Sequence, residues 1–251
     1  MRPGDPLQPA GLAPRPRVVL TVGVHGSAST WVFNVVRELM GAAFGPDRVA
    51  ACFAVNPDDI TQAERMATQH LVVKTHGWPD LPAFATDHDA AVIVSVRDPR
   101  DAVLSVMQRF GDSLDACVSG VGRDCQCARA CSDAGFDVLR YEDGFFNEPA
   151  AVRHIHTALG LTVAEAEMDR IFSDYRTDAV RAMAAGVASL PPERRRDLGR
   201  HGMLDRVTLI TGTHIGDGSI GKWREAFDAE MRAKLTRFFA PFLFRFGYPP
   251  G

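Results

Sequence analysis

Short apolar runs, separated by segments with helical spacing, dominate the chain from residue 17 onward. Val18 to Val22, Leu71 to Thr75 and Ala90 to Val96 are mostly apolar or β-branched. Continuous runs of this length are typical of parallel strands that are buried on both faces. The other predicted strands are Arg48 to Val55, Phe136 to Tyr141 and Val207 to Thr211.

Apolar residues at mixed three- and four-residue spacing follow most of these runs. Between Ser29 and Met40 they form one helical face, which Gly41 is expected to end. The other predicted helices are Pro57 to Gln69 after an Asn56 N-cap, about Arg100 to Phe110 after Pro99, Pro149 to Leu159 before Gly160, a long helix from the Thr162–Glu165 capping box to Ala185, and Trp223 to Phe246 with a break at Pro241.

This alternation predicts an α/β fold of three layers, with a central parallel sheet covered by helices on both faces, as in P-loop NTPases. We expect residues 17–251 to form one domain and the proline-rich residues 1–16 to form a disordered leader. Asp112 to Gly135 is expected to be irregular. Ligands of such sheets bind at the carboxyl ends of the strands, so we expect the functional residues there.

Composition narrows the class of protein. The chain has 251 residues, enough for one sizeable core, and a formal net charge of −3, which offers no general attraction to nucleic acid or an anionic membrane. No apolar run approaches the roughly 20 residues of a membrane span, and the N-terminal stretch lacks the apolar core of a signal peptide. The expected location is therefore cytoplasmic, where thiols stay reduced. The oligomeric state is left open.

Cysteines gather in the segment that is expected to be irregular. Cys117, Cys125, Cys127 and Cys131 are four of the five in the chain. Thiolates at short spacing can bind zinc, although the Cys-x2-Cys pairs typical of zinc sites are absent. Three interpretations stay open here: free thiols in a surface insertion, disulfides, or a zinc site.

The loop between the first strand and the first helix predicts a phosphate site. It is rich in glycine and serine, which lets backbone N–H groups approach an anion, and the following helix presents its positive end. Ser27, Ser29 and Thr30 add hydroxyl groups. A kinase-type loop reads GxxxxGK[ST], but with Gly23 in first place Ser29 occupies the lysine position. An ordinary ATP or GTP enzyme is therefore disfavoured.

Five stretches of the sequence, taken in order, resemble the sulfotransferases that use 3′-phosphoadenosine 5′-phosphosulfate (PAPS). The loop resembles the family's basic residue followed by Ser-Gly-Thr/Ser-Thr-Trp. The five stretches are Gly26-Ser27-Ala28-Ser29-Thr30-Trp31, Lys74-Thr75-His76, Arg97 with Ser105 eight residues later, Arg140-Tyr141-Glu142-Asp143, and Gly218 to Phe227 with its Gly-x-x-Gly-x-Trp pattern. The resemblance as a whole spans residues 17 to 248 and ends in the family-like Phe246-Gly247-Tyr248.

The resemblance implies roles for these residues. The loop residues 26–30 would hold the 5′-phosphosulfate, Arg97 and Ser105 the 3′-phosphate, and Trp31 and Tyr141 the adenine. The C-terminal segment would contribute Gly218, Gly221, Lys222 and Trp223 to the nucleotide site. His76 would be the general base that deprotonates the acceptor, and Lys74 would neutralise the sulfuryl group. No metal is required if cationic side chains and N–H groups stabilise the charge.

Two positions depart from the family pattern. Gly26 stands where relatives carry the basic loop residue, and His25 beside it is the candidate substitute. Gly216-Asp217-Gly218 stands where relatives carry Arg-Lys-Gly, so Asp217 would repel a phosphate unless Lys222 or Arg224 compensates. The expected function is sulfuryl transfer to a hydroxyl, less readily an amine, of a small molecule or glycan. The alternatives are a nucleotide kinase or other NTPase of related fold, and a non-catalytic nucleotide-binding protein.

Each candidate residue also has a purely structural interpretation. Trp31 and Tyr141 can be core residues, His76 can cap a neighbouring backbone group, and Arg97 can form an ion pair with Asp98 or Asp101. The run Arg194-Arg195-Arg196 is either a solvated face or part of a mobile lid over the acceptor.

Overall fold

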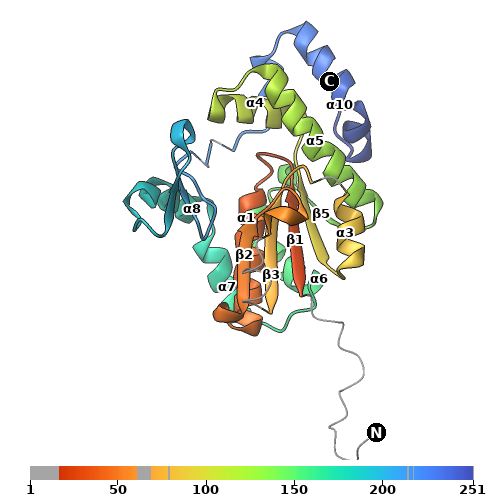
Figure 1. Ribbon diagram of the computed structural model, residues 1–251. Coiled ribbons are helices and arrows are strands. Elements are labelled where there is room, and N and C mark those ends of the chain that lie inside the picture. Colours follow the sequence, from red (N-terminus) through yellow and green to blue (C-terminus); the bar gives the residue numbers. More distant parts are fainter. Residues whose placement is uncertain (1–16, 61–68, 79, 214, 217, 251) are drawn as a thin grey trace, which may run out of the picture.

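A computed structural model describes residues 17–60, 69–78, 80–213, 215–216 and 218–250 (Figure 1). Three features expected from the sequence lie outside these residues: the leader at 1–16, most of the helix expected after Asn56, and Asp217. The element described directly after Asn56 is a short 3-10 helix, Pro57–Asp59, and Asn56 caps it, because its side chain accepts the N–H groups of Asp58 and Asp59.

The centre of the molecule is a five-stranded parallel sheet in the order β2-β3-β1-β4-β5. The chain order reverses beside β1, which is where α/β sheets of this kind bind ligands. Five of the predicted strands are thereby confirmed, with small shifts at their ends. The strands are β1 Val18–Gly23, β2 Val49–Phe53, β3 His70–Thr75, β4 Ala91–Val96 and β5 Asp137–Arg140.

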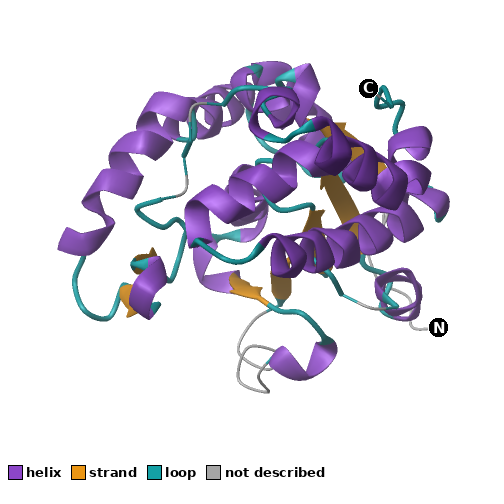
Figure 2. Cartoon of the chain, turned by 90° about the horizontal axis from the view of Figure 1, so that it is seen from above, coloured by secondary structure: helices purple, strands orange, loops and turns teal. Residues whose placement is uncertain are grey.

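Helices cover both faces of the sheet, as Figure 2 shows from above. On one face, Val19 and Ile93 pack in a buried cluster with three helices: α1 (Ser29–Phe44), α6 (Pro149–Ala158) and α7 (Glu165–Asp174). On the other face, their neighbours Leu20 and Val94 pack in a cluster with four helices: α3 (Leu81–Asp87), α4 (Pro99–Phe110), α5 (Leu114–Asp133) and α10 (Ala229–Arg245). Successive residues of a strand point to opposite faces, so the continuous apolar strands fill both layers. The predicted three-layer α/β fold is confirmed.

The remaining elements are short. They are α8 Thr177–Gly186, α9 Trp223–Ala226 and the 3-10 helices η1 Pro46–Arg48, η2 Pro57–Asp59, η3 Tyr141–Asp143, η4 Phe145–Asn147, η5 Val187–Ser189 and η6 Gly199–His201.

A second, two-stranded sheet stands apart from the main one, and we call it the β6–β7 hairpin. It pairs β6 (Arg195–Asp197) with β7 (Met203–Asp205) in antiparallel fashion. The edge strand predicted over Val207 to Thr211 is wrong. The Asp205 carboxylate accepts the N–H of Val207 and the hydroxyl of Thr208, which turns the chain instead of extending it.

The segment from Asp112 to Gly135, predicted to be irregular, is the 20-residue helix α5. Ser113 caps it by accepting the N–H of Ala116. The buried residues repeat at helical spacing, but they are small, so the sequence shows little amphipathic contrast. The residues of this buried face are Cys117, Val121, Cys125, Ala128 and Cys131.

The cysteines of α5 are core residues rather than members of a surface insertion. Cys117, Cys125, Cys127 and Cys131 are buried, and none of these four forms a disulfide. Within the described residues, no cysteine belongs to a group of side chains that could hold a metal ion. Of the three interpretations, only that of free thiols is confirmed.

Two predicted helix ends were also wrong. Helix α1 continues past Gly41 and ends at Gly45, whose positive φ of 96° suits glycine and whose N–H bonds to the Gly41 carbonyl. The long helix predicted to reach Ala185 is divided into α7 and α8, and its capping box is absent because the first residue before α7 is Ala164 and Glu165 pairs with Arg153.

The C-terminal helical segment breaks earlier than predicted. The break falls between α9 and α10, where the Asp228 side chain accepts the N–H of Met231 and starts the new helix. Pro241 lies inside α10.

Candidate active site

The loops that follow β1, β3, β4 and β5 gather at one edge of the sheet, as predicted. Val22 of β1 lies opposite Thr75 of β3, and Gly23 lies opposite Ser95 of β4, so these strands end at the same level. This brings residues 23–30, 74–76, 97 and 141 to one edge, although they are spread over more than a hundred positions of the chain.

The loop after β1 has the backbone shape of an anion cradle. A Cβ atom at Gly23 would lie 2.3 Å from the Cβ of Ser29, so only glycine fits where the loop folds back on the helix. Gly26 and Ala28 both have positive φ, 77° and 59°. Helix α1 then starts at Ser29 without a side-chain cap. The N-terminal end of this helix carries a partial positive charge, so it attracts anions.

Ser27 is placed differently from our expectation. Its side chain is fully buried, and its hydroxyl lies 2.8 Å from that of Ser95 on β4. Its backbone N–H donates to the carbonyl of Val24. The hydroxyl of Ser27 therefore fixes the loop to the sheet instead of facing a phosphate, and Ser29 and Thr30 stand at the helix start.

Arg97 connects three segments at the end of β4. Its Nη1 donates to the Gly26 carbonyl at 3.0 Å and its Nη2 to the Ser219 carbonyl at 2.9 Å. Its guanidinium lies 4.3 Å from the centre of the Tyr141 ring. A Cβ atom at Gly26 would lie 3.4 Å from both Arg97 Nη1 and Ser105 Oγ, so these two side chains border the loop together. The ion pair considered for Arg97 is not observed, because Asp98 pairs with Arg100 instead.

The glycine-rich C-terminal segment is held against the same region by Asp101 of α4. Its carboxylate accepts the N–H of Gly221 at 2.5 Å and the N–H of Trp223 at 3.0 Å. Trp223 is buried, with its ring 3.9 Å from the guanidinium carbon of Arg100. Gly218 and Gly221 have φ values of 76° and 82°, and Lys222 is half-buried beside them.

Trp31 and Tyr141 are packed into the protein. Trp31 belongs to the core around α1 and makes an edge contact with Phe145 at 5.5 Å. Tyr141 stacks on Phe146 at 4.8 Å, and its hydroxyl donates to the Gly218 carbonyl at 3.4 Å. Both rings therefore have a structural role, and a contact with adenine stays a prediction.

His25, Lys74, His76 and Asp124 form a compact polar group, which we call the histidine cluster. The rings of His25 and His76 are stacked, with their centres 3.8 Å apart. His76 Nδ1 lies 2.5 Å from the Gly23 carbonyl and His76 Nε2 lies 3.0 Å from Lys74 Nζ. Since a carbonyl accepts only from N–H, Nδ1 carries the proton of a neutral ring, and Nε2 carries the lone pair.

Burial and nearby positive charges lower the pKa values of two members of this cluster, Lys74 and His76. The pKa of Lys74 is lowered from 10.5 to about 7, mainly by burial and then by the charge of Arg109, against a smaller opposite effect of Asp124. The pKa of His76 is lowered well below 6.5 by burial and by the charges of His25, Lys74 and Arg109. Arg109, on the last turn of α4, thus extends the cluster, and its Nη2 donates to the hydroxyl of Thr211.

Asp124 of α5 is the member of the cluster that the sequence did not reveal. Its Oδ2 accepts the backbone N–H of His25 at 3.0 Å and lies 2.5 Å from His25 Nδ1. The two residues are 99 positions apart, and Asp124 sits in the segment predicted to be irregular. Had the helical spacing of residues 117–131 been recognised, a buried acid within it would have been the signal.

The donor atoms of His25, His76 and Asp124 lie within 4.8 Å of one another, which is close enough for a shared metal ion. Their hydrogen bonds argue for a different use. Both nitrogens of His76 already face protein partners, and one partner is the amino group of Lys74, which repels a cation when protonated. The arrangement fits a network for moving protons better than a metal centre.

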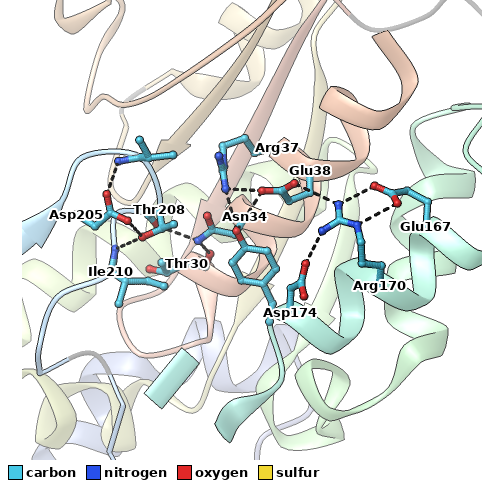
Figure 3. A network of polar contacts seen from close by, with 12 residues as sticks. Thr30, Asn34, Arg37, Glu38, Glu167, Arg170, Asp174, Asp205, Thr208 and Ile210 are labelled. Atoms are coloured by element: carbon cyan, nitrogen blue, oxygen red, sulfur yellow. Dashed lines mark hydrogen bonds and ion pairs between the residues drawn. The ribbon is translucent and has the colours of Figure 1, made fainter. Parts of the chain in front are cut away.

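Asn34, one turn after Thr30 on α1, ties the cradle to the segment after the β6–β7 hairpin (Figure 3). Its Nδ2 donates to the carbonyls of Thr30 and Thr208, both at 2.8 Å. Thr208 in turn donates to Asp205, which pairs with Arg194. Arg194 of the arginine run thus has a structural partner.

Comparison with known proteins bears on the fold. No protein-family model matches the chain, and no curated protein sequence matches it. Among solved structures, the chain is similar to mouse sulfotransferase SULT7A1 complexed with PAP, with a TM-score of 0.65 and 14% identity over 92% of this chain and 84% of that chain. It is also similar to retinol dehydratase, in complex with retinol and PAP (TM-score 0.54, 15% identity) and with androsterone and inactive cofactor PAP (TM-score 0.54, 14% identity), each over 92% of this chain and 82% of that chain.

At this level of identity, the likeness shows that the chain has the sulfotransferase fold. The resemblance found in the sequence motifs is thereby confirmed for the fold. Among the helices of the described part of the chain, none has the length and apolar character needed to cross a membrane.

Proposed function

We propose that the protein is a sulfotransferase that transfers a sulfuryl group from PAPS to a hydroxyl, and less readily an amine, of a small molecule or glycan. The observation that supports this most strongly is the meeting of two groups of residues at one sheet edge. One is an anion cradle bordered by Arg97 and Ser105, and the other is a proton-accepting cluster at Lys74 and His76.

The residues around the cradle fit a nucleotide with phosphates at its 5′ and 3′ positions. The start of α1 suits the 5′ group, and Arg97 and Ser105 beside Gly26 suit the 3′ group. The groups that accept hydrogen bonds from Arg97 are two neutral carbonyls, and its Nε is buried with no hydrogen-bond partner among the described residues. Its positive charge is therefore available for a phosphate.

The PAP molecules in the solved structures of similar fold support the same choice. PAP is what PAPS becomes when its sulfuryl group has been transferred. The nucleotide site of this chain would comprise loop residues 26–31, Arg97, Ser105, Tyr141, Gly218, Gly221, Lys222 and Trp223. The buried side chains of Ser27, Trp31 and Trp223 would contribute to this site mainly by holding its other residues in place.

When bound, PAPS would supply an activated sulfuryl group with a phosphate as its leaving group. In the transfer, the acceptor oxygen forms a new bond to sulfur while the bond from sulfur to the phosphate oxygen breaks and its electron pair stays on the phosphate. His76 is the proposed acceptor of the hydroxyl proton, since Nε2 carries its lone pair and its lowered pKa keeps the ring neutral at pH 7. Lys74 Nζ would give up its hydrogen bond with His76 Nε2 and contact the sulfuryl oxygens instead. No metal takes part in this scheme.

The surroundings of His76 favour a small acceptor with an apolar surface. Phe53, at the end of β2, is 45% exposed. Its ring centre lies 5.8 Å from that of His76 and 5.5 Å from Lys74 Nζ. An acceptor that packs on Phe53 would have its hydroxyl near the base. Retinol and androsterone in the retinol dehydratase structures are small molecules, which agrees with this expectation.

A non-catalytic nucleotide-binding protein is the second candidate, because Gly26 leaves the loop without its basic residue. A nucleotide kinase or NTPase is disfavoured by Ser29 at the lysine position of the loop.

Thermal protection tests the nucleotide. Adenosine 3′,5′-bisphosphate (PAP) is expected to raise the melting temperature of the protein, and ATP to raise it much less, because ATP lacks the 3′-phosphate. Equal protection by both, or by neither, contradicts the proposal.

Catalysis is tested by a screen of acceptors with labelled PAPS, in which transfer is measured as a gain in the mass of the acceptor. Transfer to a hydroxyl compound supports the enzyme. Binding of PAP without transfer to any acceptor favours the non-catalytic alternative, and magnesium-dependent ATP hydrolysis favours the kinase class.

A further inference from the structure

Asp124 has a position that the proposed reaction does not yet use. It is 3% exposed, it comes from α5, and it makes two contacts to a single residue, His25. One contact fixes the backbone N–H of His25 and the other fixes its Nδ1. A buried carboxylate that holds both the backbone and the ring of one histidine fixes where that ring points.

The contact at Nδ1 also decides which nitrogen of His25 is free to act. A carboxylate accepts and cannot donate, so Nδ1 carries a proton. Nε2 therefore points away from Asp124, and the His25 side chain is 32% exposed while that of Asp124 is 4% exposed. A ring held in this way can also donate from Nε2 when an anion lies at that nitrogen.

The stacked partner, His76, is in the opposite electrostatic situation. Its Nδ1 faces a neutral carbonyl, and its Nε2 faces Lys74. The charged groups near the two rings are Asp124 from α5, Lys74 from β3 and Arg109 from α4. Two rings 3.8 Å apart do not readily carry a charge each. Among the described residues, the Asp124 carboxylate contacts His25, whereas the partners of the His76 ring nitrogens are a carbonyl and an amino group.

The backbone explains why a cation at position 25 is favourable and one at position 26 is not. Gly26 has a φ of 77°, where a residue with a side chain is strained. A Cβ atom there would also lie 3.4 Å from Arg97 Nη1, so a basic side chain would meet a like charge. His25 precedes this turn and avoids both penalties.

We infer that Asp124 is a positioning residue that holds the His25 ring with Nε2 directed to the 5′-phosphate end of the nucleotide, in place of the basic loop residue missing at Gly26, so that in the complex one ring nitrogen donates to the carboxylate and the other to the phosphate. This inference rests on the proposed function. It divides the stacked pair into a charged ring that stabilises the leaving phosphate and a neutral ring that accepts the acceptor's proton.

Binding measurements with two nucleotides test the inference. PAP carries a 5′-phosphate and adenosine 3′-monophosphate does not, so only the affinity for PAP should depend on a cation at His25. Asp124→Asn is expected to weaken PAP about tenfold, as the loss of a charge-assisted hydrogen bond would, and to leave adenosine 3′-monophosphate unchanged. Asp133→Asn is the matched control, because Asp133 is an exposed acid at the far end of α5 that pairs with Arg245.

A double-mutant cycle separates positioning from a merely structural role. In a His25→Ala background, Asp124→Asn is expected to cause no further loss of PAP affinity. A loss that persists without His25, or that affects both nucleotides equally, overturns the inference while the proposed function stands. If the wild-type protein binds neither nucleotide, both are overturned.

Nitrogen-15 NMR spectra of the histidine rings in the PAP complex provide a second readout. The His25 ring is expected to carry protons on both nitrogens, one bonded to Asp124 and one to the phosphate, while the His76 ring carries its proton on Nδ1 alone. In Asp124→Asn saturated with PAP, the His25 ring is expected to lose this doubly protonated signature. A singly protonated His25 in the wild-type complex, or spectra that the substitution leaves unchanged, would exclude the role assigned to Asp124.

Discussion

The two sides of the candidate site treat charge in opposite ways. Around Arg97 and α4, each charged group has a fixed partner: Arg100 pairs with Asp98, and Asp101 holds the backbone of Gly221 and Trp223. In the histidine cluster, positive and titratable groups crowd together, and burial and mutual repulsion lower the pKa of Lys74 and His76. The first arrangement suits binding of a constant anion, whereas the second suits groups that must gain and lose protons.

If that contrast is correct, a substitution in the histidine cluster will have the largest effect on turnover. His76→Ala is expected to reduce labelled sulfate transfer by about 10²- to 10⁴-fold, the usual contribution of a general base, and to leave PAP affinity unchanged. His88→Ala is a matched control, since His88 lies at the exposed end of α3 and contacts Phe84. Unchanged transfer by His76→Ala would show that the base lies elsewhere.

On the other side of the site, around Arg97, substitutions are expected to change the affinity for the nucleotide. Arg97→Ala is expected to weaken PAP by about 10- to 100-fold, because hydrogen bonds to charged groups contribute about 1.5–3 kcal/mol each. Adenosine 5′-phosphosulfate, which lacks the 3′-phosphate, should bind the variant and the wild type equally. Titration calorimetry with both ligands checks this. Equal weakening of both ligands would mean that Arg97 only holds the Gly26 and Ser219 carbonyls together.

The smallest expected effect is on stability, and it depends on pH. The pKa of Lys74 is about 7 in the folded protein and 10.5 as its ordinary value, so folding disfavours its charged form. This destabilisation is complete below about pH 7 and is relieved as the pH rises from 7 towards 10.5. Lys74→Met should therefore melt about 2–4 °C above the wild type at pH 6, and this advantage should shrink towards pH 10.

The control for this prediction is Lys234→Met, because Lys234 is exposed on α10. It should shift the melting temperature by the same small amount at every pH. A constant difference between Lys74→Met and the wild type from pH 6 to pH 10 would mean that Lys74 is not held in a charge-poor environment.

The sequence predicted those parts of the fold that depend on local pattern. The strands of the main sheet are short apolar runs between turn residues, so their positions, direction and common edge could be derived, although a further edge strand was expected over Val207 to Thr211. The loop from Gly23 to Ser29 was recognised because glycine and serine are required there. Helix α5 was missed because its buried face is built from cysteine and alanine, whose small side chains give weak periodicity.

Contacts between distant segments could not be derived. Asp124 meets His25 across 99 positions, and Asp101 meets Gly221 across 120. Nothing in the sequence near either acid indicates its partner, because the contact exists only once helices α4 and α5 are packed on the sheet. Ser27 shows the same limit in reverse: its hydroxyl looked suited to a phosphate, but the approach of Ser95 on the neighbouring strand determines its contact.

The packing of Arg100 has a practical consequence for handling this protein. Its guanidinium is fully buried and donates to Thr236 at 3.0 Å and to the carbonyls of Pro249 and Pro250 at 2.7 and 3.0 Å. Residues 249 and 250 thus brace the helix that supports Arg97 and Asp101. Removing them would leave buried donors without acceptors, so any variant truncated before residue 249 is expected to lose stability in the frame of the nucleotide site.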